Sequence, residues 1–429
     1  MANDWTPAQR LAFRFGVVYL ALFCLATQIS GSLIPNLWFT YRGLGRLWPL
    51  RSITHWVAGA AFGITVPLDD VSGGETLFFW IQTAWVLVAS VAATAAWSLL
   101  DRQRRSFAAW LPWCHLAVRF VLAASLLEYG MTKVIPTQFP APPLTALVTP
   151  VGDMTLSALL WTTIGSAPAY QIATGCVEVL AAVLLLLPWT VPLGAVLGLV
   201  SLLQVLLLNL TFDIGVKLVT MHLIVLAVIL LVPVARSLAD ILVNNREAPL
   251  KGSPTPEVRL KPEPTSTSRI AVVLPIVFGG YLLGTQTYIN WSFWQVGGGG
   301  RPKSVLYGIW NVERLSVDGQ AGPPESNDYD RRWRRVVFDE PEAVVFQRTD
   351  DSFARYGSSI NRGNGTVALT KGKSRTWASR FTFDRSSDDR MRLDGEMDGH
   401  RIQAELRLVD LSTLPLLNSG FRWVRPHDP

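Results

Sequence analysis

The sequence divides into two parts that suit two different solvents. Before residue 295, several stretches of about 20 residues carry almost no charge, and an α-helix needs this length to cross a bilayer. Residues 301–429, in contrast, carry 21 Lys/Arg and 19 Asp/Glu, although only 16% of the whole chain is charged. About a quarter of a soluble domain is charged, so the first part suits lipid and the second suits water. The expected fold is a polytopic α-helical membrane bundle followed by a separate C-terminal domain.

Seven segments have the length and composition of membrane spans. They cover residues 11–30, 77–100, 113–135, 168–187, 191–210, 217–236 and 270–291. Residues 52–66 are shorter and more polar, which predicts an interfacial or re-entrant helix, with an eighth span as the alternative. No small-residue cleavage site follows the first segment cleanly, so an uncleaved anchor is favoured over a signal peptide.

Basic residues in the short loops predict the orientation in the cell membrane. Arg102, Arg104 and Arg105 lie between the second and third spans, and a second basic connection runs through 236–269. Seven spans place both connections in the cytoplasm and the C-terminal domain in an extracytoplasmic, periplasmic position. Arg42, Arg46 and Arg51 would then lie outside, whereas an eighth span would move them inside.

Changes in composition divide the chain into five parts. Residues 248–268 are rich in Pro, Ser, Thr, Glu and Lys, a composition that predicts a disordered cytoplasmic linker. The run Gly297 to Gly300 predicts a flexible exit from the last helix. The five parts are N-terminal membrane helices (1–111), a membrane core (112–247), the linker (248–268), a last transmembrane helix (269–296) and the C-terminal domain (301–429).

The C-terminal domain shows a period of two that is typical of strands. Ile402, Ala404 and Leu406 alternate with polar residues, and Asp398-Gly399 is a hairpin turn signal between two such runs. Eight or nine short strands fit into about 125 residues. This predicts a small antiparallel β-barrel or a sandwich, and a barrel of that size either holds an apolar ligand or is filled by its own side chains.

Several polar residues fall inside the predicted spans, where each is a candidate site because burial in lipid is costly. Glu128, Tyr129 and Lys133 end the third span, and Glu178 lies in the middle of the fourth, so Lys133 is a candidate partner for Glu178. Glu178, Glu128 and Lys133 are therefore the candidate catalytic residues. The alternative is structural, with a lysine that reaches the headgroups or a buried pair that joins two helices.

A second group supplies candidate ligand-binding residues at helical spacing. These residues are Tyr129, Gln171, Asn209, Asp213, Lys217 and His222. Loop capping and hydrogen-bonded structure are the competing explanations for this group. The five histidines show no metal-ligand spacing, and the three cysteines lie singly in apolar segments, so no metal site and no disulfide framework are predicted.

Two stretches resemble known families. The run Leu127 to Lys133, with Gln138-Phe139-Pro140, residues 167–178 and the polar positions 209–222, looks like the DoxX-like membrane proteins over about residues 112–240. This resemblance implies a four-helix membrane bundle and a quinone-linked redox role, since the family includes a subunit of a thiosulfate:quinone oxidoreductase. Leu306 to Val312, with Gly308 and Trp310, resembles the start of lipocalin-like barrels, where the Trp closes one barrel end.

Three functions remain open at this point. The first is a quinone-linked oxidoreductase subunit in which Glu178 and Glu128 handle protons and Lys133 or His222 contacts a quinone oxygen. Because the sequence has no flavin, haem or iron–sulfur motif, a redox partner subunit would have to bring the electrons. The alternatives are a non-enzymatic transporter or lipid-binding protein, and a structural or assembly subunit. Nucleic acid is not an expected partner, because the basic residues lie at helix ends or are balanced by acids.

Overall fold

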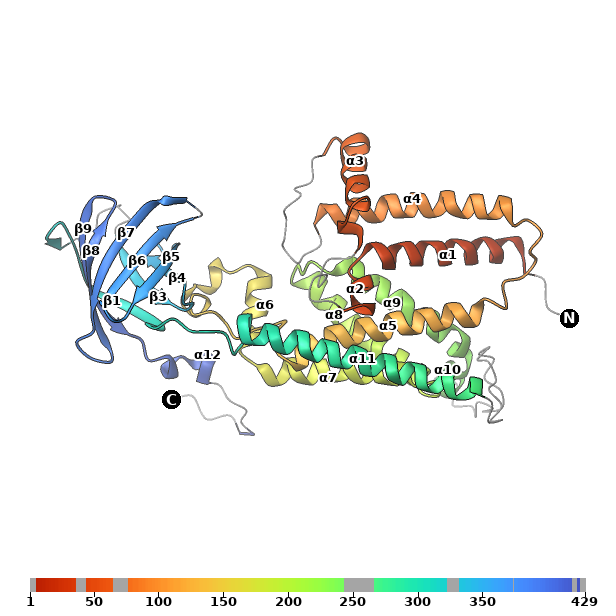
Figure 1. Ribbon diagram of the computed structural model, residues 1–429. Coiled ribbons are helices and arrows are strands. Elements are labelled where there is room, and N and C mark those ends of the chain that lie inside the picture. Colours follow the sequence, from red (N-terminus) through yellow and green to blue (C-terminus); the bar gives the residue numbers. More distant parts are fainter. Residues whose placement is uncertain are drawn as a thin grey trace. The chain divides into compact units, whose positions relative to one another are not determined.

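The computed structural model describes residues 5–35, 44–64, 76–242, 266–321, 332–372, 374–418 and 423–424, with backbone alone at 241–242, 266–272 and 374–376. The expected linker 248–268 therefore lies mostly outside the described residues. The chain forms two compact units, a helical unit of Met1–Gln138 with Ala169–Ser292, and a second unit of Phe139–Pro168 with Phe293–Pro429 (Figure 1). The predicted helical membrane bundle with a small C-terminal barrel is confirmed.

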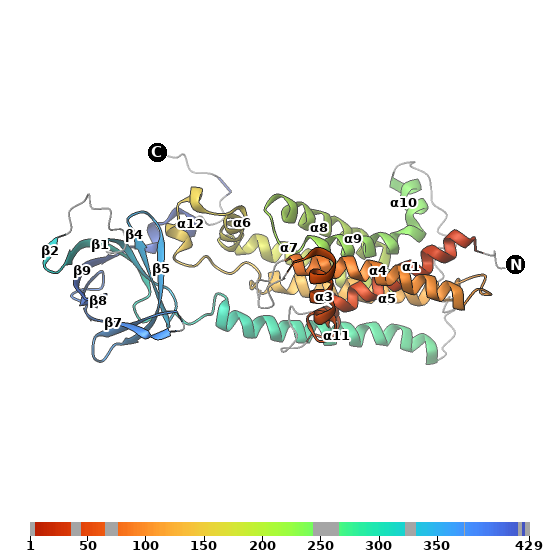
Figure 2. The same ribbon diagram turned by 90° about the horizontal axis from the view of Figure 1, so that it is seen from above.

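The helical unit is built from long apolar helices, because only a helix satisfies its own backbone hydrogen bonds in lipid. Its helices are α1 (Pro7–Ala26), α2 (Ile29–Leu33), α3 (Leu50–Phe62), α4 (Leu77–Leu100), α5 (Leu111–Val134), α7 (Pro168–Leu186), α8 (Val191–Thr211), α9 (Lys217–Leu231), α10 (Ala235–Leu242) and α11 (Ser266–Gly297). Both ribbon views show α1 beside α4, and α8 packs along α9 (Figures 1 and 2). One apolar core joins α1, α4, α5, α7, α8, α9 and α11.

Six helices in the described part of the chain are long and apolar enough to cross a membrane. They are α1, α4, α5, α7, α8 and the stretch Lys217–Asp240, which joins α9 to α10. The protein is therefore a multi-pass membrane protein. The predicted seventh span corresponds to α11, whose 32 residues include a first part that is described only as backbone.

Hydrogen bonds at the N-terminus decide whether the chain crosses the membrane between α1 and α4, where α3 lies. The amide of Trp5 donates to the carbonyl of Arg105 at 3.1 Å, and the Arg10 guanidinium donates to the carbonyl of Arg104 at 3.2 Å. The N-terminus and the α4–α5 connection therefore share one membrane face, which requires an even number of crossings between them. Spans α1 and α4 supply two, so α3 does not cross. Its 13 residues reach only about 20 Å, and it stands at a steep angle to α4, which it contacts (Figure 1).

The same parity argument assigns α11 as a span. Residues 139–168 and the chain after residue 293 belong to one compact unit, so they lie on one face of the membrane. An even number of crossings must separate them. The stretch between them contains α7, α8 and Lys217–Asp240 as spans, and α11 supplies the fourth. Within the described residues seven crossings follow, and six of them are the helices that are long and apolar enough by themselves.

The second unit contains a closed antiparallel barrel. Its strands are β1 (Gly308–Val317), β2 (Gln320–Ala321), β3 (Trp333–Phe338), β4 (Ala343–Arg348), β5 (Phe353–Asn361), β6 (Thr366–Lys371), β7 (Ser374–Asp384), β8 (Arg390–Met397) and β9 (His400–Leu408). Each strand pairs with the next along the order, and β1 also pairs with β9 from Trp310↔Leu408 to Val317↔Ile402. Eight strands therefore close the barrel, while the two-residue β2 only extends the edge of β1. Of the two predicted alternatives, the barrel is correct.

Alternating side chains fill the barrel interior, as the period of two predicts. Trp310, Phe381, Met391 and Ile402 are among sixteen buried apolar residues that form this core. The Trp310 indole is fully buried and donates to the carbonyl of Leu306 at 3.0 Å.

The glycine run that leaves α11 is an ordered turn, which corrects the expectation of a flexible exit. The amides of Gly298 and Gly300 both donate to the carbonyl of Trp294, at 3.1 and 3.2 Å. A Cβ on Gly298 or Gly300 would lie 2.8 or 2.6 Å from Trp294 atoms. Glycine is needed here because the backbone passes directly over the indole.

The connection between α5 and α7 packs on the outside of the barrel. It contains η2 (Ala146–Val148), η3 (Val151–Asp153) and α6 (Leu156–Gly165). Leu144 covers Ile309 and Val337, two outward-facing strand residues that are fully buried as a result. Asp339 accepts the Leu144 amide at 2.9 Å and pairs with Arg301 at 2.9 Å. The compact units therefore divide the predicted core 112–247, since residues 139–168 belong with the barrel.

Replacing Ile309 by Asp should release this connection from the barrel, because the new carboxylate would be buried beside Leu144 without a partner. We expect a loss of about 3 kcal/mol in the free energy of unfolding of the second unit. Hydrogen–deuterium exchange of peptides from 139–168 measures the release directly. Ala378→Asp, on an exposed outward position of β7, is the matched control. Unchanged protection of 139–168 in Ile309→Asp would show that Leu144 does not hold the connection.

Candidate functional site

The predicted pair of Lys133 and Glu178 is present in the bundle. The Lys133 ammonium lies 2.6 Å from a carboxylate oxygen of Glu178, and the two side chains are only 8% and 3% exposed. The ammonium also donates to the carbonyl of Tyr129 at 3.3 Å, and Ser201 on α8 donates to the second Glu178 oxygen at 3.4 Å. The two charges therefore compensate each other. The Glu178 carboxylate has one hydrogen-bond donor on α5, which is Lys133, and one on α8, which is Ser201.

Two glycines allow this pair to form. A Cβ atom added to Gly175 would lie 2.7 Å from the carbonyl oxygen of Gly130. A Cβ atom added to Gly130 would lie 2.8 Å from the Val179 side chain. The backbones of α5 and α7 thus cross in close contact, the use of small residues that is common between membrane helices. The Cβ of Lys133 rests against Gly175, and Glu178 lies one turn further along α7. The close crossing brings the lysine and the carboxylate within hydrogen-bond distance.

Glu128 and Tyr129 face a different neighbour, the short helix α2 and the residue before it. Ser32 on α2 donates its hydroxyl hydrogen to the Glu128 carboxylate. The amide of Gln28 donates to the Tyr129 hydroxyl. This hydrogen-bonded set lies at the end of α5 that leads to residues 139–168, so it belongs to the membrane half opposite the N-terminus.

His222 occupies a third location, between α9 and α1. Its Nδ1 lies 2.7 Å from the carbonyl of Leu218, and its Nε2 lies 2.8 Å from the Tyr19 hydroxyl. A carbonyl only accepts, so Nδ1 carries the hydrogen, and in the neutral ring Nε2 then accepts a hydrogen bond from the Tyr19 hydroxyl. The ring also stacks on Phe23 with centroids 3.5 Å apart. His222 is thus held in one orientation by three contacts.

The remaining predicted residues serve local structure. Asn209 donates to the Thr220 hydroxyl at 3.1 Å and joins α8 to α9. Asp213 and Lys217 form an exposed pair at 2.7 Å, and the hydrogen bond and charge of Lys217 hold the pKa of the Asp213 carboxyl below its usual value. Gln171 is buried in the first turn of α7, at 1% exposure. The structure therefore brings together Lys133 with Glu178 and separates the other candidates into distinct contacts.

Sequence patterns did not identify four partners of these residues. They are Tyr19, Gln28, Ser32 and Ser201. Gln28 lies near the end of the first apolar segment and Ser32 lies just after it, where polar residues are typical of a connection, and they meet α5 about 100 positions later in the chain. Single hydroxyl groups such as Tyr19 and Ser201 give no periodic signal. Only the tertiary packing shows these contacts.

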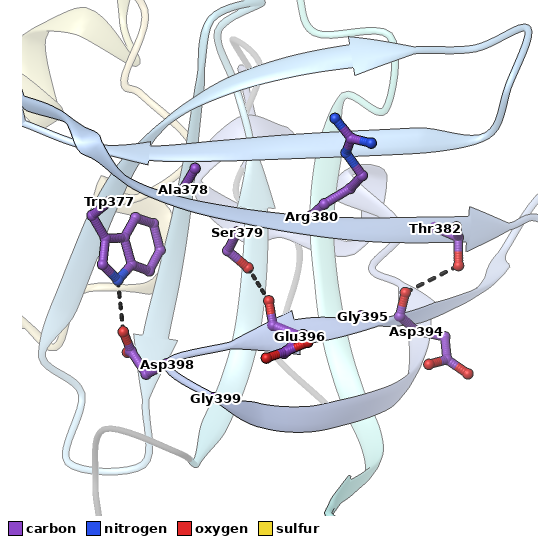
Figure 3. A pocket seen from close by; sticks show the side chains of 10 residues that line it. All are labelled: Trp377, Ala378, Ser379, Arg380, Thr382, Asp394, Gly395, Glu396, Asp398 and Gly399. Carbon is purple, nitrogen blue, oxygen red and sulfur yellow. Dashed lines mark hydrogen bonds between the residues drawn. The ribbon is translucent and has the colours of Figure 1, made fainter.

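A separate hollow of about 630 Å³ lies on the barrel over β7 and β8. Within it, Trp377 donates to Asp398 at 2.6 Å and Thr382 donates to the Asp394 carbonyl at 3.0 Å (Figure 3). The Ser379 hydroxyl donates to the carbonyl of Glu396. These donors are satisfied by neighbouring strand groups, so their contacts serve to tie β7 to β8.

Comparison with known proteins finds a relative in Bacillus subtilis strain 168, described as the uncharacterized protein YwoB. The two sequences are 37% identical over 116 residues, which cover 26% of this chain and 71% of the relative. No family model matches the chain. No solved structure matches it.

Proposed function

The chain belongs to the same protein family as YwoB of Bacillus subtilis, and from this premise we propose that it is a DoxX-like integral membrane protein that acts as a quinone-linked redox subunit. The DoxX-like core is the region 112–247, and Glu128 is its proton-handling carboxyl group. The relative is uncharacterized. The geometry of the polar residues in the bundle and the resemblance in sequence support this function.

The supporting observation is the difference between the two buried acids. Glu178 forms an ion pair with Lys133 at 2.6 Å, which suits a structural role that joins α7 to α5. Glu128 has the hydroxyl of Ser32 as its hydrogen-bond partner and forms no ion pair with any residue that the structure describes. A carboxyl group at membrane depth without a cation exchanges protons with its surroundings more readily than one that is locked in an ion pair.

The neighbours of Glu128 fit a quinone in chemical type. A quinone ring needs apolar flanks and hydrogen-bond donors at its two carbonyl oxygens, and when bound it accepts two electrons and two protons. The Tyr129 hydroxyl and the Gln28 amide are donors on the residues next to Glu128 and α2, while Ile29, Leu127 and Met131 belong to the buried apolar core of the bundle. In this proposal Tyr129 and Gln28 orient the ligand, Glu128 supplies and removes a proton, and a redox partner subunit delivers the electrons.

The proposal also assigns the faces of the membrane. Arg102, Arg104 and Arg105 share a face with the N-terminus, and basic short connections favour the cytoplasm. One crossing, α5, separates this face from residues 139–168, which belong to the barrel unit. The barrel is therefore proposed to be extracytoplasmic, on the same side as the Glu128 end of α5.

Glu128→Gln should slow proton transfer to a bound quinone by about 100-fold, because general acid–base groups contribute at least this much. The measurement uses protein in nanodiscs loaded with a short-chain quinone. Binding is followed by tryptophan quenching, and reduction by a chemical reductant is followed by absorbance in stopped flow. Binding should persist in the variant, since the amide keeps the shape of the carboxyl group.

Asp213→Asn is the matched control, since it removes an exposed carboxylate from the same face of the bundle. Its reduction rate should equal that of the unmodified protein. Failure of the unmodified protein to bind quinone would overturn the whole proposal. Quinone binding with an unchanged rate in Glu128→Gln would overturn the role of Glu128 alone.

A further inference from the structure

The exposed apolar side chains of the second unit gather outside the wall of its barrel. In the part of the unit that the structure describes, no strand from β1 to β9 exposes a large apolar side chain. The outer face of the strands is therefore polar or covered by other parts of the unit. The exposed large apolar residues lie in the segments before β1 and after β9, and they are Val151, Leu156, Phe293, Val296, Val305, Leu416, Leu417, Trp423 and Val424.

Three of these segments meet in one apolar cluster on the outside of the barrel. Leu144 is a buried centre of this cluster, and Val148 from the connection, Tyr307 from the segment before β1 and Leu411 from the segment after β9 pack against it. Both ribbon views place α6 and α12 (Pro415–Asn418) on the same side of the barrel (Figures 1 and 2). The exposed apolar side chains of the three segments form what we call the docking patch, which consists of Val151, Leu156, Val305, Leu416 and Leu417.

Hydrogen bonds fix the two leucines of the docking patch in an ordered turn. Asp410 accepts the amide hydrogen of Ser412 at 2.9 Å, and the Asn418 side chain donates to the Ser412 carbonyl at 2.9 Å. The polar groups of this turn therefore bond to one another, while Leu416 and Leu417 are 43% and 45% exposed. An ordered turn that satisfies its polar groups internally and exposes adjacent leucines presents an apolar contact surface.

The chain itself brings the docking patch to the edge of the bilayer. Helix α6 ends at Gly165 and the span α7 begins at Pro168, and three residues reach at most about 11 Å. The span α5 ends at Val134, ahead of the same connection, and α11 ends at Gly297, ahead of Val305. The second unit is thus joined to membrane helices at three points. The lipid surface is therefore continuous with the segments that carry the docking patch.

The charges near the docking patch favour contact through apolar burial over attraction to charged lipids. Arg301 is paired with Asp339 at 2.9 Å, which leaves Lys303 as the second cation of residues 301–307. Asp153 and Asp410 carry the opposite charge in the other two segments. Because these charges give no net positive field, the charge of the lipid headgroups should matter little.

We propose that the docking patch inserts into the boundary between headgroups and acyl chains of the leaflet on its own side of the membrane, and so holds the barrel on the bilayer surface. Apolar side chains of interfacial segments are buried about 5–10 Å into this boundary. This membrane contact is independent of the proposed quinone chemistry, because the patch belongs to the second unit and the quinone-linked residues belong to the bundle.

Photo-crosslinking of the unmodified protein in nanodiscs tests the contact. The nanodiscs contain phosphatidylcholine with a trace of an analogue that carries a diazirine close to its glycerol group, and mass spectrometry identifies the crosslinked peptides. Peptides from 150–157 and 411–418 should be crosslinked at least about tenfold more than peptides from 377–383 of β7, since only the former reach the glycerol depth. Replacing half of the phosphatidylcholine by phosphatidylglycerol should leave these yields unchanged.

The variant Leu416→Asp/Leu417→Asp should lower the crosslinking yield of 411–418 by about tenfold, because burial of two half-exposed leucines corresponds to at least this ratio. The matched control is Ala378→Asp/Asn364→Asp, which adds the same charge at exposed positions of the barrel. It should keep the full yield at 411–418.

Three results would overturn the proposal. Crosslinking of 150–157 and 411–418 that is no stronger than that of 377–383 would show that the docking patch faces water or another protein surface. An unchanged yield in Leu416→Asp/Leu417→Asp would show that the leucines do not hold the turn against lipid. A yield that rises several-fold with phosphatidylglycerol would show electrostatic attraction to the headgroups in place of apolar insertion.

Discussion

Replacing Glu178 by leucine should destabilise the helical unit by about 3 kcal/mol, because it leaves the Lys133 ammonium in an apolar environment without its carboxylate. Lys133 is 6% exposed, and its stem is confined between α5 and Gly175. The remaining contact, to the Tyr129 carbonyl at 3.3 Å, does not neutralise the charge. Lys133→Met should lower the free energy of unfolding by a similar amount, since it leaves the Glu178 carboxylate with the Ser201 hydroxyl in place of a cation.

The double variant Lys133→Met/Glu178→Leu should recover most of this loss, to within about 1 kcal/mol of the unmodified protein. A buried ion pair gains little over apolar side chains of similar volume, because the cost of desolvation offsets the attraction between the charges. If the pair is structural, the double variant also keeps the rate of quinone reduction in nanodiscs. If Glu178 handles protons, the double variant is stable and slow.

Denaturation in mixed micelles, followed by circular dichroism, measures the four proteins of this double-mutant cycle. Ser201→Ala is the control, since it removes the 3.4 Å contact to Glu178 and leaves the ion pair intact. It should cost less than about 1 kcal/mol. If the double variant is destabilised by the sum of the losses in the two single variants, Lys133 and Glu178 do not interact energetically.

The sequence predicts the division into a membrane bundle and a water-exposed β domain, because hydropathy and the alternation of apolar residues in strands are local signals. Spans in 77–100 and 191–210 correspond closely to α4 and α8, and the alternation around Ile402 corresponds to β9. The number of crossings is not a local property. It follows from the contacts of Trp5 with Arg105 and from the packing of 139–168 on the barrel, which join residues far apart in the chain.

Prediction of the candidate site from the sequence is limited in the same way, since contacts between distant residues give no local signal. The pairing of Lys133 with Glu178 could be predicted, because an isolated lysine and an isolated carboxylate in neighbouring spans have few other partners. The difference between Glu178 and Glu128 could not, since it depends on α2, whose Ser32 contacts Glu128 from an unremarkable polar segment. His222 likewise has its partner in Tyr19, 203 positions away.

Trp310→Ala should remove about 3–5 kcal/mol from the free energy of unfolding of the barrel, the largest single effect expected there. The indole is fully buried and touches the core shared by β1, β3 and β9. Its loss creates a cavity where the barrel closes, since Trp310 is paired with Leu408 across β1 and β9. It also leaves the Leu306 carbonyl without its donor, and removes the ring over which the Arg385 guanidinium lies at 5.6 Å.

The stability of a domain this size is about 5–15 kcal/mol, so the variant should open the β1–β9 seam first. Hydrogen–deuterium exchange of peptides from β1 and β9 measures this opening, because protection there reports the closure of the barrel. Trp310→Phe should cost about half as much, since the ring volume is largely kept and only the donated hydrogen bond is lost. Trp423→Ala, at a position 92% exposed, should leave exchange unchanged. Protection of β1 and β9 that survives Trp310→Ala would mean that strand pairing alone closes the barrel.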